Sequence, residues 1–386
     1  MDFTRFRQLG GFYFFYFAFV GAFASYWSLY LKSLSFSALQ ISFALSVMQV
    51  MRIISPTIWG WIADHRSNPQ TVVRALSVAT IILFSGVFFN DKYFWLVPIT
   101  ACASFVWGGS LPLVEAITMG QLSGQTDRYG RIRLWGSVGF ILAVTIVGYL
   151  LDHVAMRWLP HIVVSMMLGI VWFAFKIPDA VAHHSEHSSE PIWNILRRRE
   201  VMLLFTACFC MTAAHGPLYI FFSIFLDDHG YNKTSIGVLW SLGVIVEVFL
   251  FLYFPKILKV IKLEHIFMGS FAVAAARFLM IGWGVRWPAL IVIAQLLHCI
   301  TFGAFHVAAM TYVHRHFQGR HQAKGQALFT SLTYGAGGTV GGLVAGALWE
   351  PIGSGLTFSL GALTAALGFV LLWTNRALIE QKSVSY

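Results

Sequence analysis

Five charged side chains inside long apolar stretches of this sequence are the residues best placed to do chemistry. They are Arg52, Glu115, Arg133, Glu247 and Arg277. A charge at the centre of a lipid bilayer costs about 2.5–3.5 kcal/mol on insertion scales, so such a residue normally faces an aqueous cavity or a partner. Arginine suits the binding of an anion, and a desolvated carboxyl group can gain and lose a proton. We therefore expect solute binding and proton transfer within a membrane.

The cationic candidates also have structural interpretations. Arg52 lies near the middle of its stretch and could bind carbonyl groups of another helix instead of a substrate anion or glycan. Glu115 and Arg133 lie on either side of Gly124 and would be level with each other if the chain forms a helical hairpin there. Arg133 could equally be an ordinary basic residue near the cytoplasmic end of a span.

The second half of the chain offers the same choice. Glu247 interrupts an almost continuous apolar run and shares a helical face with Trp240, seven residues earlier. Glu247 could exchange a proton with each transport cycle, or could form a structural ion pair with Arg277. His215 and His306 are further intramembrane candidates, although histidines in such positions more often have only a packing role.

The composition requires a membrane around these residues. Of the 386 residues, 58% are apolar and 11% are charged, against about 25% charged in a soluble domain. Apolar stretches long enough to cross a bilayer recur along the chain, with a polar stretch in the middle. This pattern predicts an all-α membrane protein with twelve transmembrane helices in two six-helix bundles, at residues 1–180 and 201–386, joined by a cytoplasmic linker at 181–200. The twelve stretches are 10–32, 38–63, 71–90, 93–121, 131–151, 157–176, 201–226, 234–256, 264–285, 287–312, 321–349 and 354–375.

The basic residues predict the orientation of these spans. With both termini in the cytoplasm, 19 of the 26 Lys and Arg residues lie on the cytoplasmic side, as the positive-inside rule requires. This asymmetry explains the net charge of +10 without a nucleic-acid partner. The four cysteines lie in apolar runs and are expected to pack rather than to bind metal. The histidines of the linker, His183, His184 and His187, could bind a metal ion but fit a solvated linker better.

A loop motif relates the sequence to a known family. Gly60, Asp64 and Arg66 follow the second stretch in the order Gly, then Asp four residues on, then a basic residue. With twelve spans and a central loop, this resembles the major facilitator superfamily. In that motif the glycine would let two helices approach closely, and the Asp would interact with a helix N-terminus or an arginine. Here the motif is shortened, because Asn68 and Pro69 stand where the family continues with Gly and basic residues.

Four further segments narrow the resemblance. Residues 114–116 and 129–140 are similar to the lactose permease group, and residues 239–248 and 296–299 look like the bacterial 3-phenylpropionate permease family. The resemblance implies that Glu115 and Arg133 bind substrate and that Phe140 takes the place of a tryptophan that stacks on a sugar ring.

The same resemblance places Arg277 and His298 in the proton-coupling region. The sequence departs from the lactose permease pattern there, because Thr301 stands where a carboxylate is expected one turn after the histidine. The acid of the eighth span is also shifted by about one turn. Glu247 would therefore have to act as the coupling carboxylate.

These features predict a secondary transporter of the bacterial inner membrane, with no enzymatic activity and no cofactor. The sequence holds no phosphate loop, paired metal-ligand motif or nucleophile constellation. The resemblance implies proton-coupled symport of an aromatic carboxylate such as 3-phenylpropionate, with Arg52 or Arg133 on the carboxylate and with Phe140 and Trp240 beside the ring. The alternatives are a sugar or nucleoside symporter, a drug efflux protein or a non-transporting receptor. The oligomeric state is left open.

Overall fold

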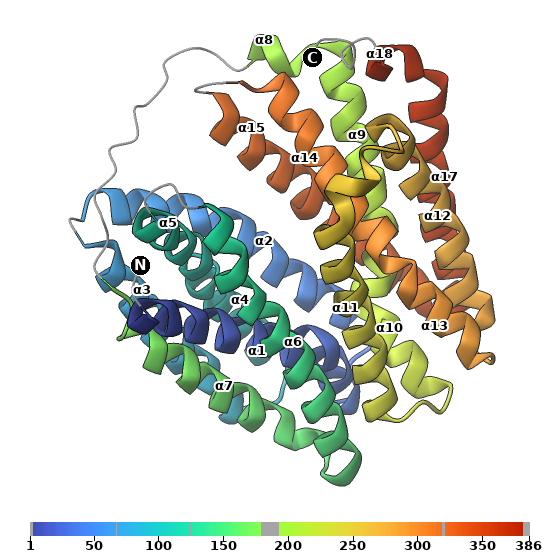
Figure 1. Cartoon of the computed structure of the whole chain (residues 1–386). Helices are drawn as coiled ribbons and strands as arrows, with labels where there is room; N and C mark the ends of the chain where they lie inside the picture. The colour runs from blue at the N-terminus through green and yellow to red at the C-terminus, as the bar shows by residue number, and fades with distance from the viewer. Residues whose placement is uncertain (1–2, 67, 123–125, 179–192, 319–320, 381–386) are drawn as a thin grey trace. The chain divides into compact units, whose positions relative to one another are not determined.

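The structure of the chain is a computed structural model that describes residues 3–66, 68–122, 126–178, 193–318 and 321–380 (Figure 1). The elements in these residues are helices. The chain divides into two compact units, of which unit 1 holds Met1–His184 together with Leu226–Ser241, and unit 2 holds Ser185–Phe225 with Leu242–Tyr386. Each unit is described by itself below.

Unit 1 is a bundle built mainly from the first half of the chain. Helix α1 packs against α6 and α7, and α4 packs against α2 and α3. The helix bounds are α1 Phe3–Ser33, α2 Ala38–Asp64, α3 Pro69–Phe84, the short 3-10 turn Ser85–Phe88, α4 Tyr93–Trp107, α5 Ser110–Leu122, α6 Thr126–His153, the 3-10 turn Met156–Trp158 and α7 Leu159–Ala174.

Small residues and helix caps explain this packing locally. A Cβ added at Gly139 of α6 would collide with the backbone carbonyl oxygen of Phe14 in α1, so only glycine allows these helices to lie so close. Helix α2 begins with a capping box, in which Ser37 Oγ accepts from the Gln40 N–H at 3.3 Å and Gln40 Oε1 accepts from the Ser37 N–H at 3.0 Å. A glycine at a close helix contact and a capping box at a helix start therefore help to form the bundle that positions the Arg52 side chain.

Unit 2 has the same helical character, with two π-helical turns. Its central pairs are α12 with α17 and α9 with α17. The bounds are α8 Trp193–Leu196, α9 Arg199–Ala214, α10 Gly216–Asp228, α11 Lys233–Ile257, α12 Leu263–Gly284, α13 Pro288–Leu296, the π turn Cys299–Ala304, α14 Phe305–His316, α15 Gln322–Phe329, the π turn Thr330–Gly337, α16 Gly338–Ile352, α17 Ser354–Thr374 and α18 Arg376–Glu380. The ends of α10 and α11 that meet at residues 226–241 belong to unit 1.

The expected spans agree with these helices. Within the described residues, eleven helices are long and apolar enough to cross a membrane, judged by length and composition. The remaining expected span, 321–349, is not among these helices, because a π turn interrupts it between α15 and α16. Glycine and threonine replace bulky apolar residues in this part of the sequence. The prediction of an all-α, multi-pass membrane protein is confirmed. The division at 181–200 stays a prediction, since residues 181–192 lie outside the described part of the chain.

Candidate functional site

Arg52 lies in the middle of α2 with its side chain exposed. Its guanidinium carbon is 4.7 Å from the centre of the Trp107 ring. Tyr16 stacks on the same ring at 4.9 Å, and Phe19 meets it edge-on at 5.0 Å. A charged group that is exposed at mid-span is not stable against hydrocarbon, so we infer that Arg52 faces water. The guanidinium can bind an anion while it rests on an aromatic face.

Glu115 and Arg133 lie together, as the hairpin geometry predicts. Arg133 Nε is 4.0 Å from Glu115 Oε1, and the two side chains are 35% and 37% exposed, respectively. The Tyr129 hydroxyl donates to the same Glu115 oxygen at 3.4 Å. A pair at this distance and exposure is weak, so both groups remain available to a ligand.

Aromatic rings also cover Arg133. Its guanidinium carbon is 3.9 Å from the centre of the Phe17 ring and 5.9 Å from that of Tyr13. In unit 1, the Arg52 and Arg133 guanidinium groups thus both rest on aromatic faces, and the Glu115 carboxylate lies beside Arg133. The sequence did not reveal Phe17 or Trp107, because a functional aromatic residue in an apolar helix has the same pattern as a packing one.

The two aromatic residues predicted to bind substrate occupy different places in unit 1. Phe140 lies two helical turns after Arg133 on α6 and packs on Gly21 of α1, where an added Cβ would be 3.3 Å from the ring. Trp240 lies on α11 and is half-buried. Its neighbour Ser241 hydrogen-bonds to Thr145 of α6 at 2.8 Å, which fixes this part of α11. No ligand contact is known for either ring, and their roles stay predictions.

Arg277 is fully buried in unit 2. Its Nε donates to the Ala294 carbonyl at 2.6 Å, its Nη1 to Thr301 Oγ1 at 3.0 Å and its Nη2 to Gln295 Oε1 at 3.4 Å. These acceptors are neutral, and Glu247 is not among them, so the direct ion pair weighed for Arg277 and Glu247 is not observed in the described residues. Thr301, where the resemblance led us to expect a carboxylate, thus binds the arginine through its hydroxyl.

Glu247 and His298 lie near the first π turn of unit 2. The Cγ of Glu247 is 3.2 Å from the position that a Cβ on Gly303 would take, so the carboxylate side chain packs on this turn. The ring of His298 is buried and stacks on Phe302 at 5.4 Å. Turns of this kind are frequent at functional sites because they redirect side chains within a helix.

The second π turn is hydrogen-bonded to helix α14, which follows the first π turn. His306 Nδ1 and the Tyr334 hydroxyl are 2.8 Å apart, and both side chains are half-buried. The sequence offered His306 as an intramembrane candidate for which a packing role is more common, and it gave no sign of Tyr334. Neither π turn could be predicted from the sequence, because a pattern of apolar residues does not show where a helix takes one extra residue into a turn.

The loop motif differs from its expected arrangement. Helix α2 ends at Asp64, and both Asp64 and Arg66 are exposed. No described atom lies within 4 Å of the position of an added Cβ at Gly60. The close helix approach expected at Gly60 is therefore absent here, since this face of α2 is open in the described part of the structure.

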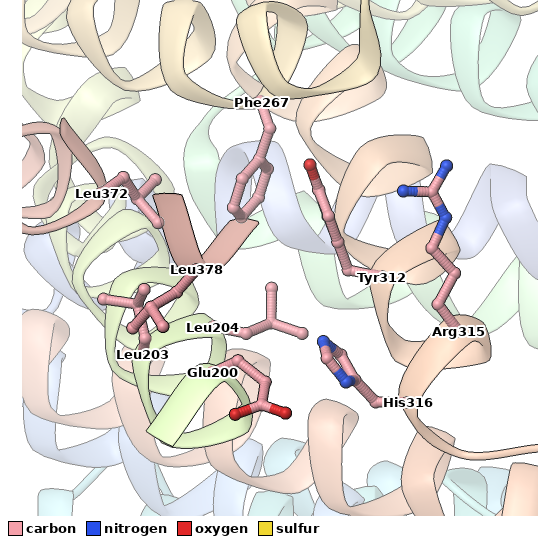
Figure 2. Close-up of a pocket in the computed structure, with 9 residues that line it drawn as sticks. All are labelled: Glu200, Leu203, Leu204, Phe267, Tyr312, Arg315, His316, Leu372 and Leu378. Atoms are coloured by element: carbon pink, nitrogen blue, oxygen red, sulfur yellow. The ribbon is translucent and has the colours of Figure 1, made fainter. Parts of the chain in front are cut away.

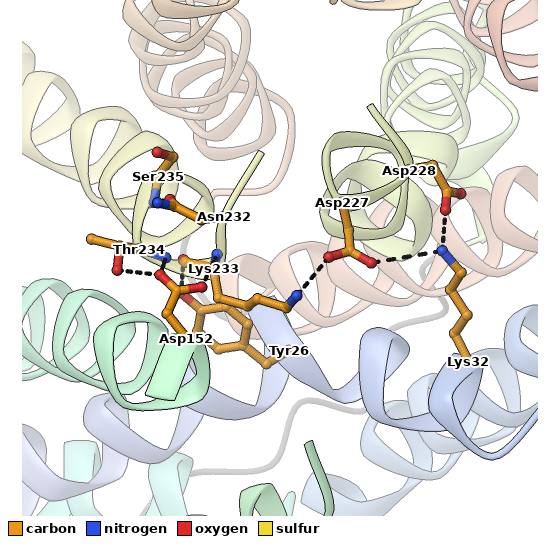
Figure 3. A network of polar contacts seen from close by, with 9 residues as sticks. All are labelled: Tyr26, Lys32, Asp152, Asp227, Asp228, Asn232, Lys233, Thr234 and Ser235. Atoms are coloured by element: carbon orange, nitrogen blue, oxygen red, sulfur yellow. Dashed lines mark hydrogen bonds and ion pairs between the residues drawn. The ribbon is translucent and has the colours of Figure 1, made fainter. Parts of the chain in front are cut away.

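A polar network that the sequence did not predict holds the connection between α10 and α11 within unit 1 (Figure 3). Asp152 of α6 accepts from the backbone N–H groups of Lys233 at 2.7 Å and Thr234 at 2.9 Å, and from the Thr234 hydroxyl. Asp152 therefore caps the first turn of α11 from another helix. Lys32 pairs with Asp228, and Lys233 Nζ pairs with Asp227 at 2.9 Å.

Helices long enough to span a membrane, with charged groups at mid-span, fit a membrane transport protein, and comparison with known proteins shows that class rather than an enzyme. The family described as "MFS_1 like family" matches residues 6–360, and the chain belongs to this family. The resemblance to the major facilitator superfamily is thereby confirmed.

Individual relatives cover almost the whole chain. A "Probable 3-phenylpropionic acid transporter" of Escherichia coli is 30% identical, over 92% of this chain and 93% of the relative. The "Nucleoside permease NupG" of the same organism is 22% identical over 82% and 81%. The crystal structure of the D323A mutant of the nucleoside transporter NupG has a TM-score of 0.86 at 19% identity, over 97% of this chain and 99% of that one. This likeness shows the major facilitator fold, with its two six-helix bundles.

Proposed function

We propose that the protein carries a small aromatic monocarboxylate across the membrane together with a proton. The observation that carries this proposal is the pair of guanidinium groups in unit 1, Arg52 over Trp107 and Arg133 over Phe17. In each case a guanidinium group rests on an aromatic ring, of which Trp107 is buried and Phe17 is half-buried. An aromatic acid has the complementary pair of groups.

The charges of unit 1 favour an anion. Arg52 and Arg133 carry two positive charges, and Glu115 carries one negative charge, which leaves one positive charge for the substrate to balance. Because Arg133 and Glu115 pair only weakly, a substrate carboxylate can bind Arg133 in place of Glu115 with little loss of interaction energy. The relative in E. coli named as a probable 3-phenylpropionic acid transporter supports this class of substrate. In the proposal, Phe140 and Trp240 add apolar surface beside the ring.

Proton coupling is proposed to depend on Glu247. Arg277 is held by neutral acceptors, so Glu247 is not neutralised by it directly. Desolvation disfavours the charged form of a carboxyl group, which suits reversible protonation. His298 and Arg277 would position the surrounding polar groups. One proton with one monoanion moves no net charge, so the pH gradient drives accumulation, with about 1.4 kcal/mol available per pH unit.

Alternating access of the two units would move the solute, as in other transporters built from repeats. The positive-inside pattern supports an inner-membrane location with both termini in the cytoplasm. Gly60, Asp64 and Arg66 would act in the conformational change rather than in binding.

A neutral sugar or nucleoside is the second candidate. Glu115 and Arg133 together can accept from and donate to hydroxyl groups, and NupG is named as a nucleoside permease. A symporter of this kind would be electrogenic, because a proton would accompany a neutral solute. A receptor would bind without flux, and an efflux protein would confer drug resistance on cells that express it.

Binding by the purified protein tests the proposed substrate class. Wild-type protein is titrated with 3-phenylpropionate, uridine and a galactoside, and compared with Arg52→Gln and Arg133→Gln. Of the three solutes, we expect only 3-phenylpropionate to bind the wild type. Each variant should bind it about tenfold more weakly, because a charge-assisted hydrogen bond is lost.

Arg74→Gln is the matched control for these variants. Arg74 also has an aromatic partner, Phe175 at 5.9 Å, but its Nε and Nη2 lie 3.4 Å from backbone carbonyl oxygens of Ala174 and Ile177. This substitution is expected to leave the affinity unchanged. Tight binding of uridine or the galactoside, with no binding of the acid, would contradict the proposal.

A further inference from the structure

A small pocket opens at one end of unit 2, among α9, α12, α14, α17 and α18 (Figure 2). The empty space among its lining atoms is about 390 Å³, part of which is open to solvent. The floor is apolar and, apart from the half-buried Leu378, buried. It is formed by Leu203, Leu204, Phe267, Leu372 and Leu378.

The rim of this pocket carries both signs of charge. Glu200 begins α9, while Arg315 and His316 end α14. Figure 2 shows the Glu200 carboxylate and the Arg315 guanidinium at opposite sides of the pocket. The Nη1 of Arg315 is shielded from solvent and has no hydrogen-bond acceptor among the described residues. A shielded, unsatisfied guanidinium N–H favours an anionic acceptor from a ligand.

The surroundings of the pocket have the features of a membrane interface. Helix α9 begins and α17 ends at this level, and Arg199 Nη2 binds Asn375 Oδ1 across the two ends at 3.4 Å. Trp193 and Trp373 are 65% and 52% exposed there. Exposed tryptophans at the ends of spans occur at the level of lipid headgroups, where basic residues also gather.

We propose that this pocket binds the headgroup of an aminophospholipid, such as phosphatidylethanolamine. The lipid phosphate accepts from Arg315 and His316, the primary ammonium donates to Glu200, and the first methylenes of an acyl chain cover the leucine floor. The site is separate from Arg52, Arg133 and Glu247, so it does not depend on the proposed substrate.

Native mass spectrometry of the delipidated full-length protein tests the proposal. The protein is titrated with phosphatidylethanolamine, phosphatidylglycerol or phosphatidylcholine, and retained lipid is counted. We expect about tenfold stronger retention of phosphatidylethanolamine than of the other two. Glu200→Gln should abolish this preference, and Arg315→Gln should weaken retention of the lipid by about tenfold or more. Equal retention of the three lipids by the wild type would overturn the proposal.

Two further variants keep the test independent of folding. Leu378→Trp, in the short helix α18, should fill the floor and reduce lipid retention without changing a charge. Arg376→Gln removes a charge at the same end, from an exposed residue that does not line the pocket, and should have no effect. Normal lipid retention by Leu378→Trp, or displacement of the lipid by free phosphoethanolamine or leucine, would reject a lipid site.

Discussion

Removing the carboxylate of Glu115 should reveal the sign of the substrate's charge. Arg133 Nε and Glu115 Oε1 are 4.0 Å apart, a distance at which two unit charges interact by about 1 kcal/mol in water and about 4 kcal/mol at an effective dielectric constant of 20. Because about a third of each side chain is exposed, screening brings the value close to the lower figure. Glu115→Gln should therefore tighten the binding of an aromatic monocarboxylate by about 1 kcal/mol, or about fivefold.

The same variant should have the opposite effect on a neutral substrate. A sugar or nucleoside that donates hydroxyl groups to Glu115 would lose charge-assisted hydrogen bonds and bind about tenfold more weakly. Isothermal titration at low and high salt measures both cases, and the gain for the acid should shrink as salt screens the charges. Asp91→Asn removes an exposed carboxylate elsewhere in unit 1 and is the control. Weaker binding of the acid by Glu115→Gln would refute the anion site.

Three further predictions concern stability, each measured by thermal unfolding in detergent. Asp152→Ala should lower the free energy of unfolding by about 1–2 kcal/mol, because the cap on α11 is lost. Asp152→Asn should lower it less, because the Asn side chain still accepts hydrogen bonds, and equal losses would contradict capping. Arg277→Met should lower the free energy of unfolding by about 3 kcal/mol or more, because it leaves buried acceptors without a donor. An unchanged melting temperature would contradict this and would mean that water replaces the guanidinium group. Gly139→Ala should lower the free energy of unfolding by about 1–3 kcal/mol, because the added Cβ meets the backbone of α1. Gly60→Ala, where the added Cβ meets open space, should leave it unchanged or raise it slightly. Similar effects of the two variants would disprove the close packing at α6.

Much of the fold followed from the lengths of the apolar stretches. Each was long enough to cross a bilayer, and helices occupy these stretches in the structure, with ends that differ from the expected ones by up to seven residues at the start of α1. The pairing of Glu115 with Arg133 followed from their symmetry about a turn. Both predictions rest on local spacing, which the sequence contains directly.

Other features depended on contacts between distant residues. The cap that Asp152 provides for α11 joins positions 81 and 82 residues apart. The ion pair of Arg277 with Glu247, which the sequence left open as an alternative, is replaced by neutral acceptors of α13 and the following π turn. The aromatic faces beneath Arg52 and Arg133 come from other helices, and the sequence pattern does not distinguish them from packing residues. These features require the tertiary structure.

Uptake into proteoliposomes tests the central proposal most directly. Purified protein is reconstituted, a pH gradient is imposed with and without a membrane potential, and accumulation of labelled 3-phenylpropionate is followed for the wild type and for Glu247→Gln. We predict about tenfold accumulation per pH unit, insensitive to the membrane potential, and loss of accumulation in the variant with exchange preserved. Accumulation driven by sodium or by the membrane potential, or unchanged accumulation by Glu247→Gln, would contradict proton-coupled carriage of a monocarboxylate.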